Sequence, residues 1–193
     1  MTARTHDLAA IMAFGGLMLV YQDHAVGLAS VLVGLLANQI GGIAPDIDQP
    51  TAPLWRNLPL TKSLGKIFGN FIGGHRFLTH SFVGLFLAGI IANLFLGFIK
   101  PILGSVDQVF VWRSFMLGLF SHLLVDTFTK EGVPWFLPIP VRIGLPPFKK
   151  LRMTTGKFGE KFFFTVLLLF DMAIVWQNFE TVKQIARKVL LKK

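Results

Sequence analysis

The chain has 193 residues, no cysteine and a formal net charge of +9. Apolar residues make up 53% of it and charged residues 15%, against about 25% charged in an average soluble domain. The mean hydropathy is +0.61. This composition excludes an ordinary soluble domain and a disordered chain. The lack of cysteine excludes a disulfide scaffold, thiolate metal ligands and a cysteine nucleophile.

Five apolar runs approach the length of about 20 residues that a helix needs to cross a bilayer. They lie at 5–21, 26–44, 81–99, 109–126 and 161–178. Two other stretches, 45–80 and 127–160, mix aromatic residues with Lys, Arg and Pro, which is typical of segments at headgroup depth. We therefore predict an all-α, polytopic membrane bundle with about five spans and two interfacial loop segments.

The whole chain, 1–193, is expected to form one membrane-embedded domain with a basic C-terminal tail over 181–193. Most Lys and Arg fall on the side where the chain begins, so the positive-inside rule favours a cytoplasmic position for that side. The expected location is the inner membrane. In so apolar a chain, the net positive charge indicates contact with anionic lipid rather than with nucleic acid.

If all five runs cross the membrane, eight His and carboxylate residues from six segments reach one face. They are His6, Asp46, Asp48, His75, His80, His122, Asp126 and Glu160. His122 and Asp126 are four residues apart and share a helix face, and Asp46 and Asp48 point the same way if their segment is extended. Because ionisable groups next to hydrocarbon are costly, such a cluster predicts a functional site, here a metal site.

Imidazole and carboxylate ligands without cysteine suit zinc, with manganese or iron as alternatives. Two or three such ions can polarise a phosphoryl group and generate hydroxide at neutral pH. Asp48 or Glu160 is the candidate general base. Arg76 is the candidate phosphate-binding residue, because guanidinium matches phosphate geometry. Loop aromatics such as Trp135 are expected to hold acyl chains, and Arg113 is expected to pair with Asp171 across two spans.

An ordered series of motifs carries a family resemblance. The motifs are T-H (5–6), P-D-I-D (45–48), H-R-x-x-T-H-S (75–81), S-H-x-x-x-D-T (121–127) and T-G-x-x-x-E (155–160). Together they resemble the YdjM/DUF457 family of bacterial and archaeal membrane-bound metal-dependent hydrolases. The resemblance implies a multi-span helical protein with a hydrolytic metal centre. A looser similarity links the chain to zinc-dependent phospholipase C, although the N-terminal Trp ligand of that kind is absent.

We expect a membrane-embedded, metal-dependent hydrolase that cleaves a phosphoester of a phospholipid or lipid-linked phosphate at the bilayer interface. Its expected partners are the membrane and this lipid substrate, with no nucleic acid. The alternative is a divalent-metal transporter or sensor that uses the same His and Asp cluster, although transport sites usually lie near the bilayer midplane. An intramembrane metalloprotease ranks last because the H-E-x-x-H signature is absent.

Overall fold

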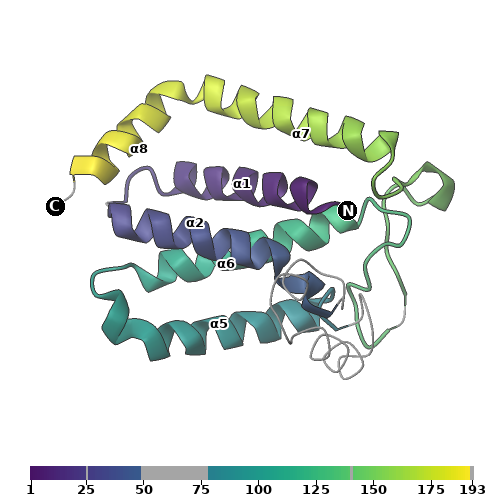
Figure 1. Ribbon diagram of the computed structural model, residues 1–193, viewed down its shortest axis with the longest axis horizontal. Coiled ribbons are helices and arrows are strands. Elements are labelled where there is room, and N and C mark those ends of the chain that lie inside the picture. Colours follow the sequence, from purple (N-terminus) through teal and green to yellow (C-terminus); the bar gives the residue numbers. More distant parts are fainter. Residues whose placement is uncertain (25, 49–77, 140, 192–193) are drawn as a thin grey trace, which may run out of the picture.

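The computed structural model describes residues 1–24, 26–48, 78–139 and 141–191 (Figure 1). Its helices are α1 (Ala3–Val20), α2 (Leu28–Ile43), α5 (Phe82–Leu103), α6 (Gln108–Asp126), α7 (Phe158–Gln177) and α8 (Phe179–Leu191). Two short 3-10 helices, η1 (Ala44–Asp48) and η2 (Lys149–Leu151), accompany them. The predicted all-α class is therefore confirmed for these ranges.

Three of the described helical segments are long and apolar enough to cross a membrane. They are Leu28–Ile47, Phe82–Leu103 and Gln108–Asp126, which correspond to the second, third and fourth predicted spans. The first and fifth predicted spans form helices α1 and α7, which are not among these three. The count of about five spans is therefore not confirmed.

The five long helices lie side by side, with α7 along one edge of the bundle and α5 along the other (Figure 1). Helix α6 is central because α1, α2 and α5 all pack against it. The N-terminus, η1, the starts of α5 and α7 and the end of α6 gather at one end of the bundle. Helix α8 lies at the opposite end.

Helices α2 and α6 approach closely through glycine. A Cβ at Gly118 would lie 2.0 Å from the Asn38 carbonyl oxygen, and one at Gly41 would lie 2.1 Å from the Phe115 carbonyl oxygen. Asn38 is fully buried, and its Nδ2 donates a hydrogen bond to the Ser114 carbonyl at 3.0 Å. Small residues are typical of such close contacts between membrane helices. The contact fixes the end of α2, and η1 after it, against the last turns of α6.

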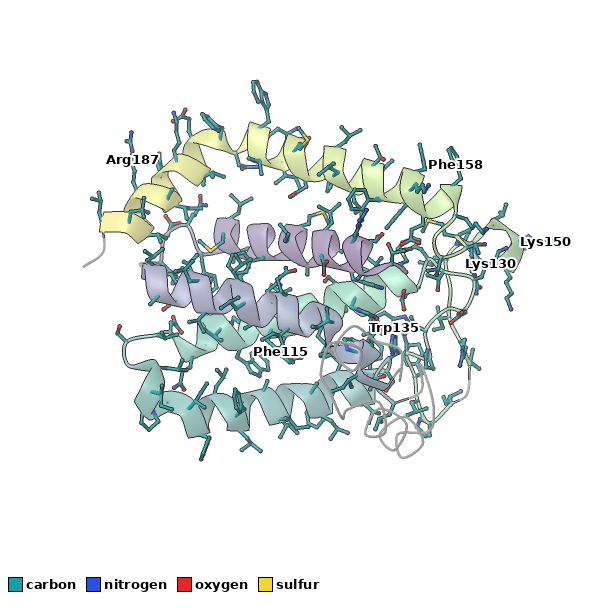
Figure 2. The ribbon with its side chains drawn as sticks, in the orientation of Figure 1. Phe115, Lys130, Trp135, Lys150, Phe158 and Arg187 are labelled. Carbon is teal, nitrogen blue, oxygen red and sulfur yellow. The ribbon has the colours of Figure 1, made fainter. Side chains whose placement is uncertain are left out.

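The segment between α6 and α7 closes this end of the bundle. Trp135 is 7% exposed and packs in a core cluster with Leu119 and Leu123. Its Nε1 donates a hydrogen bond to the Thr127 hydroxyl at 3.0 Å. Figure 2 shows Trp135 at this end, far from Arg187 on α8. The predicted acyl-chain role does not suit Trp135, because its ring is buried in the core of the protein.

Candidate metal centre

Five of the predicted site residues meet at the end of the bundle that contains the N-terminus. His6 lies in the first turns of α1, Asp46 in η1, His80 just before α5, and His122 and Asp126 in the last turns of α6. The side chains of His80, His122 and Asp126 are fully buried, and that of His6 is 2% exposed. The Asp46 side chain is 26% exposed. Four elements thus bring together imidazole and carboxylate groups that are far apart in the sequence.

Two histidines and two aspartates of this set lie close together. The Nε2 atoms of His80 and His122 lie 3.9 and 3.7 Å from Oδ1 of Asp46. The same two atoms lie 3.6 and 3.8 Å from Oδ2 of Asp126. Two atoms bound to one tetrahedral ion at 2.0–2.1 Å are about 3.3–3.4 Å apart. The observed spacing is therefore slightly wider than that around a single small divalent ion.

A second group of possible ligands adjoins the first. One possible ligand atom from each of His6, His122 and Asp126 lies within 4.8 Å of the other two, and the same is true of Asp46, His80 and His122. Nε2 of His6 lies 3.4 Å from Oδ1 of Asp126, and the His6 ring stacks on His122 at 3.7 Å. The α-ammonium group of Met1 also contacts this Oδ1, at 2.6 Å. The Asp126 carboxylate therefore presents one oxygen to each group.

The hydrogen bond at the back of His122 sets its tautomer. Nδ1 of His122 lies 2.6 Å from the Gly42 carbonyl oxygen, which can only accept, so Nδ1 carries the hydrogen. In the neutral ring Nε2 then has a lone pair, as in metal-binding histidines. Nε2 is buried and has no hydrogen-bond partner among the described residues. It faces carboxylate oxygens of Asp46 and Asp126, and a cation between these atoms would remove the repulsion between their lone pairs.

The side chains of three predicted site residues lie outside the part of the chain that the structure describes. His75 and Arg76 lie outside the described residues, and so does the side chain of Asp48. The sequence placed Asp46 and Asp48 on one face on the condition that their segment is extended, and this condition is not met, because Ala44–Asp48 forms the 3-10 helix η1. The roles predicted for Asp48, His75 and Arg76 stay predictions.

Glu160 lies in the first turn of α7 and belongs to neither group of possible ligands. Its Oε1 accepts hydrogen bonds from the Thr2 backbone N–H at 2.6 Å and from the Thr2 and Thr5 hydroxyls at 2.8 Å. Its Oε2 accepts from the Gly156 N–H at 2.6 Å. Burial would raise the pKa of Glu160, but these hydrogen bonds lower it below its ordinary value. Glu160 thus anchors α7 to the start of α1, and its predicted role as ligand or base stays a prediction.

Sequence reasoning missed the groups that support the site. The Gly42 carbonyl sets the His122 tautomer, and the Thr2 and Thr5 hydroxyls hold Glu160. The adjacent glycines Gly41 and Gly42 were the available signal, because paired small residues in an apolar helix indicate close approach of another helix. No sequence signal points to a backbone carbonyl as a partner of one particular histidine.

The fold and this cluster define a polytopic helical membrane protein with a candidate metal centre at one end of its bundle. The family model described as YdjM inner membrane protein matches residues 1–183. The chain therefore belongs to the YdjM family. Together with the three helical segments able to cross a membrane, this supports the predicted multi-pass location in the inner membrane.

The chain is also similar to individual proteins. YvsG of Bacillus subtilis (strain 168) is 26% identical over 162 residues, which cover 83% of this chain and 86% of the relative. Inner membrane protein YdjM of Escherichia coli (strain K12) is 31% identical over 105 residues, and so is its namesake in Shigella flexneri. These alignments cover 54% of this chain and 48% of each relative, so the match spans about half of their length. No solved structure matches the chain.

Proposed function

We propose that this protein is a metal-dependent hydrolase that cleaves a phosphoester of a phospholipid or lipid-linked phosphate at the bilayer interface. The observation that carries the proposal is the buried Nε2 of His122, which has no hydrogen-bond partner among the described residues and faces carboxylate oxygens of Asp46 and Asp126. In this proposal His80 and His122 hold one ion with the two aspartates. His6 and the second oxygen of Asp126 contribute to a neighbouring ion.

A divalent ion at this position would stabilise the charge that develops on a phosphoryl oxygen and lower the pKa of water. In the reaction, water supplies the oxygen that attacks phosphorus, the ester P–O bond breaks, and the alcohol leaves with a proton. Asp46 is the most exposed of the five gathered side chains, so we place the approach of the phosphate on its side. Asp48 remains the candidate base, and Arg76 the candidate phosphate-binding residue.

The position of the cluster supports an enzyme over a metal transporter. The candidate ligands lie in η1, just before α5 and in the last turns of α6, which are the ends of the three helical segments able to cross a membrane. Transport sites usually lie near the bilayer midplane, between broken helices. An interfacial position instead matches a substrate whose phosphate group lies at headgroup depth.

The test compares two histidine variants of the detergent-purified protein. His122→Ala removes a proposed ligand, whereas His24→Ala removes an exposed histidine near the opposite end of the bundle. We expect His122→Ala to lose bound metal and at least about 100-fold in phosphate release from phospholipid, more than is usual for residues that only support a ligand. His24→Ala is expected to keep both. Metal content is measured by inductively coupled plasma mass spectrometry. Phosphate release is measured, with and without a chelator, as free phosphate together with released headgroup, because cleavage of one ester bond of a phosphodiester leaves the phosphate on one of the two products.

Two results would overturn the proposal. One is a purified protein that takes up no divalent metal, or whose phosphate release is unchanged by the chelator. The other is a protein that binds metal and hydrolyses neither phospholipid nor polyprenyl phosphate, but carries divalent ions across proteoliposome membranes. That second result would establish the transporter alternative.

A further inference from the structure

An apolar groove runs between α2 and α5. It encloses about 560 Å³, within the roughly 300–1,000 Å³ range of ligand pockets. Helices α2 and α5 both pack against α6 and make little contact with each other in the described part of the chain. Val111, Phe115 and Leu119 of α6 form the floor, and Figure 2 shows Phe115 between the ribbons of α2 and α5. The groove is therefore a gap between two helices that share one neighbour.

Several small residues line the groove. Gly84, Ala88 and Ala92 line it from α5, and their spacing of four residues places them on one helix face. Ala37 lines it from α2. The described lining is apolar apart from Thr79, with no charged side chain in it. Such a surface offers no partner to a polar or charged ligand, but it matches a hydrocarbon chain.

One end of the groove adjoins the candidate metal centre. Pro45 and Ile47, on either side of Asp46, line it, and so does Thr79 just before His80. The Thr79 hydroxyl lies 3.0 Å from Nδ1 of His80, so the lining and the site are in direct contact.

The other end of the groove reaches Ile99. From Gly84 to Ile99 the helix rises about 22 Å at 1.5 Å per residue. Half of a bilayer's hydrocarbon core is about 15 Å thick. The groove is therefore long enough for a chain that extends from the interface through one leaflet.

We propose that this groove holds one acyl chain of the phospholipid substrate, with its phosphate end at Asp46, His80 and His122. The proposal rests on the function proposed above and adds the part of the substrate that the protein recognises. Ile91 on the rim is 66% exposed, so the groove opens sideways between helical segments that can cross the bilayer. The occupant is thus a chain that already lies in the membrane, and the groove's length fits one leaflet chain better than a much longer polyprenyl chain.

The test fills the groove and compares two substrates with the same headgroup. Ala92→Trp and Ala37→Trp each place a large ring in the groove, away from the metal centre. Ala173→Trp places the same ring on an exposed position of α7. Hydrolysis is measured with a long-chain and a dibutyryl phospholipid in mixed micelles. We expect the ratio of long-chain to short-chain rates to fall at least about tenfold in both groove variants, since losing even one or two methylene contacts has effects of this size. In Ala173→Trp the ratio should be unchanged.

A second measurement separates failure of the groove from failure of the enzyme. A phospholipid with a photoreactive diazirine near the end of its acyl chain is cross-linked to the unmodified protein in phosphatidylcholine vesicles. Labelling of α2 and α5 residues in the groove that is lost in Ala92→Trp and kept in Ala173→Trp supports the proposal, even if no lipid is hydrolysed. Labelling that is equal in all three proteins, or a rate ratio unchanged in both groove variants, overturns it. Cleavage of polyprenyl phosphate but not of long-chain phospholipid overturns the choice of an acyl chain.

Discussion

The two ends of the helical bundle both contain polar side chains in contact with one another, but these contacts differ. At the end near α8, the guanidinium of Arg113 donates a hydrogen bond to the Tyr21 hydroxyl and lies 5.7 Å from the centre of that ring. Asp107 caps α6 by accepting from the Phe110 N–H at 3.0 Å, and its own N–H donates to the Ser30 hydroxyl at 2.9 Å. These side chains are linked by direct hydrogen bonds.

At the opposite end, imidazole and carboxylate groups lie close together at longer distances. The imidazole nitrogens of His80 and His122 lie 3.6–3.9 Å from the carboxylate oxygens of Asp46 and Asp126. Hydrogen bonds between such groups are about 2.7–3.2 Å long. The first end is thus held by direct hydrogen bonds, whereas the longer imidazole–carboxylate distances at the second end are those that the proposed cation would bridge.

The largest effect should come from removing a charge at the end that contains the candidate metal centre, with a charge removed at the other end as the control. Asp126→Asn removes the carboxylate that faces both groups of possible ligands, whereas Asp107→Asn keeps a side chain that caps helices as well as Asp does. We expect metal affinity and phosphate release to fall at least about 100-fold in Asp126→Asn, above the range usual for supporting residues. Both should be unchanged in Asp107→Asn. Metal titration of the apo protein measures this, and full metal binding by Asp126→Asn would contradict the comparison.

A large effect on stability is expected at the glycine contact that holds α2 against α6. Gly118→Ala forces a methyl group against the Asn38 carbonyl, and overpacking of this kind costs about 1–3 kcal/mol. Gly97→Ala on α5 is the matched control, because a Cβ there meets nothing within 4 Å. The thermal midpoint in detergent should fall clearly in Gly118→Ala and stay near the wild-type value in Gly97→Ala. Equal midpoints would mean that the contact between α2 and α6 is looser than described.

An intermediate effect is expected at Glu160. Glu160→Gln weakens the hydrogen bonds that tie α7 to the start of α1, which we expect to cost about 1–3 kcal/mol at neutral pH. Because these bonds lower the pKa of Glu160, the stabilisation is present above its ordinary range and is lost as the pH falls through the lower, folded-state pKa. The difference in thermal midpoint between wild type and Glu160→Gln should therefore shrink in acid. Glu180→Gln on α8, where the exposed carboxylate pairs with Lys183, is the control and should have little effect. A variant that loses all bound metal would instead support the predicted ligand role.

The smallest effect is expected from Tyr21→Phe at the end near α8. The change removes only the hydroxyl that accepts from Arg113, and we expect a loss of about 1 kcal/mol or less in stability. Metal content and phosphate release should match the wild type, because Tyr21 lies at the other end from the candidate metal centre. Loss of metal from this variant would show that the two ends are coupled rather than independent.

Much of the helical structure could be predicted from hydropathy. The five predicted runs agree with α1, α2, α5, α6 and α7 to within a few residues at each end. Most of the stretch predicted as a basic tail lies in helix α8, in which apolar residues are interleaved with Lys183, Arg187 and Lys188. Such a helix is amphipathic, and its mean hydropathy does not reveal it.

The candidate site could be predicted as a set of residues, but not as a geometry. Counting spans brings His6, His122 and Asp126 to one face, because each lies at a helix end. The expected pair of Arg113 with Asp171 is wrong, since Arg113 donates to Tyr21. Depth in a membrane does not say which helices are neighbours or how each is rotated. For the same reason, the hydrogen bond from His122 to Gly42 could only come from the structure.

The sideways opening of the groove between α2 and α5 also determines which measure of lipid concentration controls binding. Because the groove opens sideways, the proposed acyl chain would reach it by two-dimensional diffusion within the leaflet and would not pass through water. Occupancy then depends on the mole fraction of that lipid in the membrane, and not on its amount per volume of suspension. Adding inert lipid lowers the occupancy even when the total quantity of ligand stays constant.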